Sequence, residues 1–292
     1  MIPRRPYGST GLMVSVLGLG AMQIGDPALE ETQAASLLNA ALDAGITLID
    51  TARSYGLSEE RIGKHLAARR DEFLLSTKLG YGVPGVEDWT GPCITAGIER
   101  AMHVLQTDRI DIAHLHSCPR EILERGDVIA ALEQAKRDGK VRAIAYSGDN
   151  EALAYAVATR RFDGFMASLN LCDQRVIDEV LPSITGSGFI AKRPAANHPW
   201  RFPQRPAGDE SEAYWLRWRE MDLDRRGREW GEIALRFAIT PPQVSSSVVG
   251  TSSVTHLQQD IAWAVKGGLD AGMFEELRAE FRRHGHGWPG RV

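Results

Sequence analysis

The feature that most constrains the fold of this chain is a regular alternation of short apolar runs with segments of helical periodicity. Each run is bounded by glycine or polar residues and has the length of a buried strand. Eight runs can be counted, at 16–22, 46–50, 73–78, 110–116, 141–148, 164–170, 188–192 and 244–250. Eight such units predict an α/β protein with a closed parallel (β/α)8 barrel, the TIM barrel, rather than an open doubly wound sheet.

The segments around these runs complete the predicted architecture. A turn at 7–12 lies between two short extended runs and predicts a small N-terminal β-hairpin. No linker or composition break divides the chain, so residues 1–292 are expected to form a single domain. A stretch rich in Pro, Trp and Arg at about 194–222 is interpreted as a long loop, and 274–292 as a C-terminal tail.

Helical periodicity is clearest in the first half of the chain. Ser58 is followed by two glutamates and predicts the N-cap of a helix. The helices expected there are 31–42, 58–66, 94–105 and 121–135.

Composition excludes several classes of function. Lys plus Arg total 34 and Asp plus Glu total 38, so the formal charge is 34 − 38 = −4. This balance gives no electrostatic reason to expect nucleic acid or an anionic membrane as a partner. No apolar run suits a signal peptide or a membrane span. The three scattered cysteines fit a reducing compartment, so a soluble cytoplasmic protein is expected.

Glycines at the end of the first run raise the question of a dinucleotide-binding fingerprint. Gly18 and Gly20 have the first spacing of that motif, but the next glycine is Gly25 and no helix opens after Gly20. The Rossmann interpretation therefore fails its structural context. A glycine here instead predicts close approach of a ligand to the backbone.

Four polar residues lie at or just after the ends of three consecutive predicted strands. Asp50, Lys78 and His116 each close a strand, and Tyr55 lies in the loop just after Asp50. In a parallel barrel all four meet at one rim, where such barrels carry their chemistry. A tyrosine, with a reference pKa of about 10, is a poor acid at neutral pH, and a neighbouring ammonium lowers that pKa. With Asp50 holding the lysine and His116 donating to a substrate oxygen, the set predicts a general-acid site.

Each of these residues also has an ordinary structural interpretation. Asp50 could cap a turn, Tyr55 could be a loop aromatic, and Lys78 could be a surface residue with a buried stem. His116 could be a core histidine with satisfied hydrogen bonds. The coincidence of all four at strand ends favours the catalytic interpretation.

Further motifs accompany these residues in a fixed order. They are Gly8-Ser9-Thr10-Gly11-Leu12, Asp50-Thr51-Ala52, Tyr55-Gly56, Ser58-Glu59, Ser76-Thr77-Lys78, Asp111 with His116, and Val249-Gly250-Thr251-Ser252-Ser253. Over nearly its whole length the chain thus resembles the aldo-keto reductase superfamily. The resemblance implies a (β/α)8 barrel in which Tyr55 protonates a carbonyl oxygen while a nicotinamide delivers hydride to the carbon. Lys78 and Asp50 would tune Tyr55, and His116 would orient the carbonyl of a small-molecule substrate.

The same resemblance assigns a nicotinamide-binding side, and here the chain departs from the family pattern. The implied positions include Gly20, Ala21 and Met22 after the first strand. Where the family often has a Ser-Asn pair, this chain has Ser147-Gly148, and Met166 stands in the place of a glutamine. Neither glycine nor a thioether can make the missing amide hydrogen bonds.

A second departure replaces the family's stacking tyrosine with Lys192-Arg193. A guanidinium can stack on a flat ring and can also pair with phosphate. We therefore expect Lys192 or Arg193 to contact cofactor phosphates or an acidic group of the substrate, with solvated rim charges as the alternative.

By the same resemblance, a phosphate-binding segment is expected near the C-terminus. Hydroxyls and backbone amides before a helix starting near Val254 suit a phosphate. NADP is the expected cofactor, and NAD stays an open alternative because a histidine replaces the usual strongly basic residue. The positions matching the adenosine-phosphate segment are Gly250, Thr251, Ser252, Ser253, His256, Gln259 and Asp260.

Two rival functions are compatible with the same barrel. His114 and His116 face the same way on one strand and suggest a metal-dependent hydrolase, although further ligands are missing from the neighbouring strand ends. The weakened amide contacts suggest a non-catalytic sensor or partner subunit that binds a nicotinamide cofactor. The sequence predicts neither the substrate nor the oligomeric state.

Overall fold

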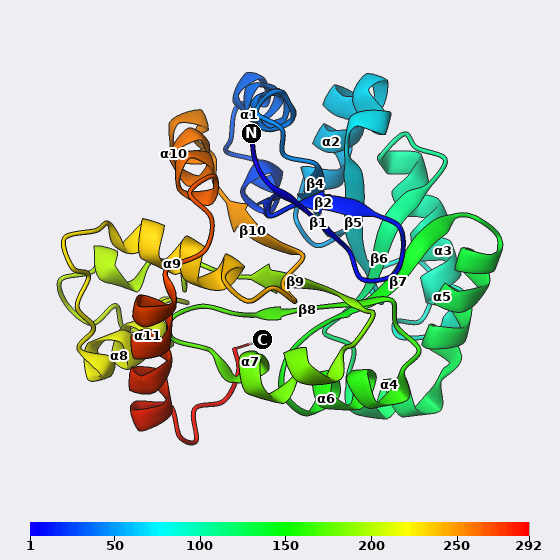
Figure 1. Ribbon diagram of the computed structural model, residues 1–292. Coiled ribbons are helices and arrows are strands. Elements are labelled where there is room, and N and C mark those ends of the chain that lie inside the picture. Colours follow the sequence, from blue (N-terminus) through cyan, green and yellow to red (C-terminus); the bar gives the residue numbers. More distant parts are fainter. Residues whose placement is uncertain (292) are drawn as a thin grey trace.

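The computed structural model of the protein describes residues 1–291 and has a closed barrel of eight parallel strands at its centre (Figure 1). Around the barrel the strands follow the order β10-β3-β4-β5-β6-β7-β8-β9. Their bounds are β3 Leu17–Gly20, β4 Leu48–Asp50, β5 Leu74–Leu79, β6 Ile110–His116, β7 Val141–Ser147, β8 Gly164–Ser168, β9 Gly188–Lys192 and β10 Ser246–Gly250. Each lies within one residue of a predicted apolar run or inside it, so the predicted TIM barrel is confirmed.

Helices surround the barrel on its outside (Figure 1). The α-helices are α1 Glu31–Asp43, α2 Ser58–Leu66, α3 Gly91–Val104, α4 Arg120–Arg125, α5 Asp127–Arg137, α6 Asn150–Thr159, α7 Arg175–Glu179, α8 Glu212–Met221, α9 Trp230–Ile239, α10 Val254–Ala264 and α11 Ala271–His284. Short 3-10 helices occupy Gln23–Gly25, Ala67–Glu72, Leu181–Ser183 and Pro199–Arg201. Within residues 1–291, no helix has the length and apolar character needed to cross a bilayer.

The predicted hairpin is present as well. Strand β1 (Arg4–Pro6) pairs antiparallel with β2 (Met13–Ser15). Between them, the fully buried Tyr7 lies against Gly164 and Gly188, the first residues of β8 and β9, where any Cβ would overlap its ring. The hairpin therefore packs against the amino end of the barrel, which leaves the carboxyl ends of the strands for a site.

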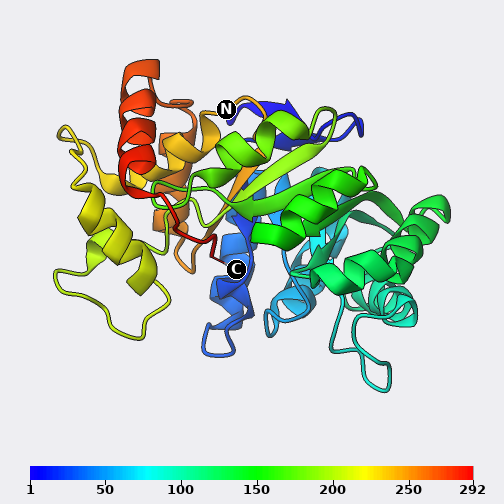
Figure 2. The ribbon, with the colours of Figure 1, turned by 90° about the horizontal axis from the view of Figure 1, so that it is seen from below.

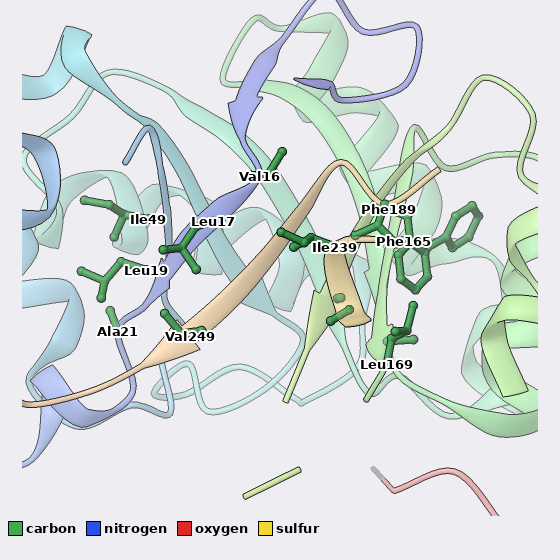
Figure 3. Close-up of a cluster of buried hydrophobic side chains, with 14 of the residues drawn as sticks. Val16, Leu17, Leu19, Ala21, Ile49, Phe165, Leu169, Phe189, Ile239 and Val249 are labelled. Carbon is green, nitrogen blue, oxygen red and sulfur yellow. The ribbon is translucent and has the colours of Figure 1, made fainter. Parts of the chain in front are cut away.

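Alternation along each strand divides the apolar side chains into two clusters. Inside the barrel lie residues such as Leu48, Met166 and Val248. Their neighbours in sequence, such as Ile49 and Phe165, belong to the larger cluster that packs strands against helices. Figure 3 shows part of that larger cluster, with labelled side chains from β3, β4, β8, β9 and β10. This period of two is what a strand with both faces buried requires.

Two local predictions in the first half of the chain are wrong. The helix expected at 121–135 is divided at Gly126, whose φ of +82° ends α4 and precedes α5. Ser58 is the first helical residue of α2 rather than its N-cap, which is Leu57. The Ser58 hydroxyl instead lies 2.8 Å from Thr51 Oγ1, so it fixes the loop that carries Tyr55.

The stretch at 194–222 is not a continuous loop as expected, because it contains α8 and the short 3-10 helix at Pro199–Arg201. Tyr214 and Met221 of α8 are buried, and Arg217 donates a hydrogen bond to the Pro289 carbonyl at 2.6 Å. The expected tail is likewise helical as far as His284. Figures 1 and 2 show the remaining C-terminal segment, in red, turning back from α11 toward the barrel.

Candidate active site

The four residues predicted to carry the chemistry come from three neighbouring strands of the barrel. Asp50 ends β4, Lys78 lies one residue before the end of β5, and His116 ends β6. Tyr55 lies in the loop between β4 and α2. Because parallel strands in a closed barrel share one carboxyl rim, the structure brings all four to the same edge.

A buried ion pair forms the base of the site. Lys78 Nζ lies 2.6 Å from Asp50 Oδ2 and donates to the Thr51 carbonyl at 2.7 Å. Asp50 Oδ1 accepts a hydrogen bond from Ser76 Oγ at 2.7 Å. Burial alone would lower the pKa of Lys78, but its interactions with Asp50 and Tyr55 outweigh burial and raise that pKa. The lysine is therefore held as an ammonium, and Asp50 is not a turn cap.

Tyr55 lies directly beside this ammonium. Lys78 Nζ is 4.7 Å from the centroid of the Tyr55 ring, and the ring meets that of His116 edge-on at 6.1 Å. The Tyr55 loop packs on the 3-10 helix at Gln23–Gly25, where a Cβ on Gly25 would overlap the Tyr55 carbonyl oxygen. Glycine is needed at position 25 for this close approach, which fixes the backbone of the tyrosine.

His116 is a neutral imidazole in this setting. Burial, followed by the charges of Lys78, Lys192 and Arg193, lowers its pKa to about 3. Its Nδ1 lies 2.8 Å from the hydroxyl of Tyr81, and the two rings stack with centroids 5.7 Å apart. A neutral histidine keeps one N–H donor and one acceptor nitrogen.

His114 plays a different part from His116. It is fully buried, its Nε2 lies 3.0 Å from Ser76 Oγ, and burial lowers its pKa well below the usual value. Among residues 1–291, no group of three or more His, Cys, Asp or Glu side chains is arranged to hold a metal ion. The hydrolase alternative therefore finds no ligand set in the part of the chain that the structure describes.

The residues expected at the nicotinamide lie at the ends of the next strands. Ser147 ends β7 and pairs in register with both His116 and Met166. Met166 is 1% exposed and belongs to the cluster inside the barrel. A Cβ on Gly148 would overlap the Tyr146 hydroxyl, so this position takes no larger residue without rearrangement.

Lys192 and Arg193 already have protein partners. Lys192 Nζ forms a buried ion pair with Asp149 Oδ2 at 2.8 Å. Burial lowers the pKa of Lys192 although the charge of Asp149 opposes it. Arg193 donates to the Arg291 carbonyl at 2.7 Å, and Ser168 Oγ donates to the same oxygen at 3.0 Å. Arg291 thus lies against the carboxyl ends of β8 and β9.

The segment expected to bind the adenosine phosphate adjoins the first strand. Gly250 of β10 pairs in register with Gly20 of β3, and Ala21 and Met22 follow directly. Ser253 is the N-cap of α10 and accepts a hydrogen bond from the His256 amide. Thr251 Oγ1 accepts from the Ser253 amide at 3.0 Å. The remaining positions, Ser252, His256 and Gln259, are exposed, and Asp260 is partly buried.

Sequence reasoning assigned no role to three polar residues of this rim. Ser76 bridges Asp50 and His114, Asp149 binds Lys192, and Tyr81 binds His116. Tyr81 lies three residues after the predicted strand 73–78, and Asp149 directly follows the predicted strand 141–148. A position just after a strand end is therefore the signal that could have found them. Their partners are distant in sequence, so no local pattern identifies the contacts.

Comparison with known proteins places this geometry in a family. The sequence model of the Aldo/keto reductase family matches residues 16–279. L-galactose dehydrogenase of Arabidopsis thaliana is 28% identical over 96% of this chain and 93% of its own length. D-threo-aldose 1-dehydrogenase of a Pseudomonas species is 31% identical over 92% of this chain and 94% of its own length.

A solved structure agrees with the sequence relatives. The holo form of an aldo-keto reductase from Bacillus halodurans superimposes with a TM-score of 0.83 at 26% identity, covering 96% of each chain. Family model, relatives and fold all match nearly the whole chain. The protein is therefore an oxidoreductase of the aldo/keto reductase family.

Proposed function

We propose that this protein reduces an aldehyde or ketone to an alcohol by hydride transfer from a reduced nicotinamide cofactor, with Tyr55 as the general acid. One observation supports this above all others. A buried ammonium, that of Lys78, is held by Asp50 and lies 4.7 Å from the Tyr55 ring centroid. The ammonium can stabilise the negative charge that develops on the Tyr55 oxygen as its proton passes to the alkoxide.

The other residues of the rim complete the proposed mechanism. Asp50 keeps the Lys78 charge and its position, since it is the lysine's ionic partner. His116, as a neutral imidazole, donates a hydrogen bond that orients the carbonyl oxygen toward Tyr55. After transfer, Tyr55 regains its proton from solvent before the next turnover. The same residues in reverse would take the proton from an alcohol during oxidation.

The residues at the other end of the site suit a nicotinamide dinucleotide. The amino end of α10 offers backbone N–H groups and the hydroxyls of Ser252 and Ser253, a setting that favours phosphate. Close by, Gln23 Oε1 is buried next to Gly250, with no hydrogen-bond partner among residues 1–291, and can accept from a ligand hydroxyl. When bound, the cofactor supplies the hydride that reduces the carbonyl carbon.

NADP is the proposed cofactor, with NAD as the alternative. Asp260 stands near this segment, and a charged carboxylate would repel a 2′-phosphate. Burial raises the pKa of Asp260 to about 7, so at neutral pH the side chain carries only part of its charge. The exposed His256 is the candidate hydrogen-bond donor to that phosphate.

The direct test is a screen of aldehydes and ketones with NADPH and NADH side by side, following the loss of reduced cofactor. Because two relatives are named as dehydrogenases of sugars, the screen includes aldoses and is also run with oxidised cofactors. We expect turnover of at least one carbonyl compound, with NADPH preferred. Binding of cofactor without turnover of any compound would contradict the proposal and favour the sensor alternative.

A further inference from the structure

We propose that Tyr81 is a positioning residue that holds His116 in the tautomer with its proton on Nε2. The Tyr81 hydroxyl lies 2.8 Å from His116 Nδ1, and the two rings stack at 5.7 Å with an interplanar angle of 21°. This inference rests on the proposed function, because it concerns how His116 is prepared to orient a carbonyl.

Because His116 is neutral, its tautomer decides which ring nitrogen can donate a hydrogen bond. Burial and the charges of Lys78, Lys192 and Arg193 lower the pKa of His116 to about 3, so both nitrogens cannot carry protons near neutral pH. A neutral imidazole has one donor and one acceptor, and the partner of one nitrogen fixes the role of the other. Only the tautomer with the proton on Nε2 leaves a donor there when Nδ1 is engaged by Tyr81.

In the proposed arrangement Tyr81 is the donor to His116 Nδ1. Its hydroxyl also comes within donating distance of Ser54 Oγ, at 3.2 Å, but it has one proton to give. The contact with His116 is shorter, at 2.8 Å, and an imidazole nitrogen is a more basic acceptor than a serine hydroxyl. The proton of Tyr81 is therefore committed to Nδ1.

The loop after β5 is built to hold Tyr81 in this place. Gly80 has a φ of +139°, and a Cβ there would overlap the ring of Trp89. The Trp89 amide donates to the Gly80 carbonyl at 2.7 Å, and the Gly82 amide donates to Asp88 Oδ1 at 2.6 Å. Trp89 then packs on Tyr81, with ring centroids 5.5 Å apart. Tyr81 is thus confined between Trp89 and His116.

This arrangement separates the roles of two tyrosines at one rim. Tyr55 lies beside the Lys78 ammonium and has His116 as an edge-on neighbour. Tyr81 contacts His116 instead, and in the proposed arrangement its hydroxyl proton is donated to His116 Nδ1. A carbonyl oxygen between them would accept from Tyr55 and from His116 Nε2–H, and Tyr81 would act only through His116.

The decisive experiment reads the tautomer by NMR in full-length protein labelled with 15N-histidine, near neutral pH. His116→Asn identifies the signals of His116 by their loss. In the wild type we expect a protonated Nε2 and an unprotonated Nδ1. In Tyr81→Phe, which keeps the stacking ring, we expect the alternative tautomer to become populated. A proton on Nδ1 in the wild type, or an unchanged tautomer ratio in Tyr81→Phe, would overturn the proposal.

Kinetics supply the second readout. Loss of a partner that orients a metal-binding histidine costs about 10- to 100-fold in activity. We expect a fall of similar size in kcat/KM of Tyr81→Phe, while the cofactor Kd stays unchanged. The control is Tyr155→Phe on α6, which loses a hydroxyl on the outside of the barrel and should match the wild type. A shifted tautomer with an unchanged kcat/KM would overturn the positioning role.

The two proposals can fail separately. If the wild type reduces no carbonyl compound, the proposed function fails, but the NMR spectrum still judges the tautomer. If the wild type is active and its His116 carries the proton on Nδ1, the inference fails and the proposed function stands. Should Tyr81→Phe not fold, the wild-type spectrum alone decides the assignment.

Discussion

The Nζ atom of Lys78 lies 2.6 Å from Asp50 Oδ2, and the two side chains are only 2% and 4% exposed. Two charges so deep in a barrel are tolerated because each satisfies the other and both make further hydrogen bonds, to Ser76 and to the Thr51 carbonyl. The ion pair keeps the Lys78 ammonium in a fixed position beside Tyr55. Both the stability of the fold and the catalytic activity should therefore depend on this ion pair.

Replacement of Asp50 by Asn removes the negative charge while keeping the size of the side chain. It should therefore show how much of the stability and activity depends on that charge. The ammonium of Lys78 would lose its countercharge, and breaking one side of a buried pair typically costs about 3–5 kcal/mol of unfolding free energy. The pKa of Lys78 should fall, since burial would then dominate. We expect kcat to drop by about 100-fold or more, as for loss of general-acid function. Chemical denaturation and steady-state kinetics measure the two effects.

Asp111→Asn is the matched control for this prediction. Asp111 is equally buried and pairs with Arg70 and Arg142, but it lies near the amino end of β6, away from the rim. It should lose stability and keep kcat near the wild-type value. Equal losses of kcat in both variants would show that the effect of Asp50 is merely structural.

Two glycines in the loop after β5 give a paired test of the Tyr81 scaffold. Gly80→Ala adds a Cβ that overlaps Trp89, in addition to backbone strain at φ +139°. Gly85→Ala places a Cβ in open space at φ +74°, so it should carry only a backbone cost of about 1–2 kcal/mol. We expect Gly80→Ala alone to lower kcat/KM. Indistinguishable kinetics for the two variants would argue against a functional role for this packing.

His116 should leave a signature in the pH dependence of stability. Its folded-state pKa is lowered to about 3 by burial and neighbouring cations, against a reference value of 6.5. The stabilisation it provides is therefore fully present above about pH 6.5 and is lost as the pH falls toward 3. The contribution to the slope of the unfolding free energy reaches about 1.4 kcal/mol per pH unit within that window.

Denaturation curves at several pH values measure this slope. His116→Gln should have a shallower slope than the wild type between pH 6.5 and 3. His103→Gln, on the exposed face of α3, serves as the control and should leave the slope unchanged. An identical slope for the wild type and His116→Gln would contradict the assignment of a neutral, buried His116.

The barrel could be predicted from the sequence because its determinants are local. Each strand is a short apolar run, and each polar residue at a strand end reaches the rim by topology alone. Asp50, Lys78 and His116 could therefore be brought together without knowing any contact. Gly126 shows the limit of this reasoning, because a helical pattern runs through it and only its φ of +82° divides the helix.

What could not be predicted depends on contacts between distant segments. The amphipathic pattern of α8 is weak. Its residues Tyr214 and Met221 are buried by segments that are distant in the sequence, so no local pattern predicts the helix. Lys192 or Arg193 was expected to contact a ligand, but no local pattern showed that Lys192 also has an ion-pair partner in Asp149, forty-three positions earlier. Tyr81 meets His116 only because its loop folds back over Gly80. Such pairings follow from loop shape rather than from any local pattern.

The central claim is that the Tyr55 hydroxyl gives its proton to the substrate while the cofactor site is formed independently of it. The most direct measurement is the single-turnover rate of hydride transfer in Tyr55→Phe, read alongside the Kd of the reduced cofactor. We predict a rate lower by about 100- to 10,000-fold with a Kd within about twofold of the wild type. A rate within about threefold of the wild type would contradict the account.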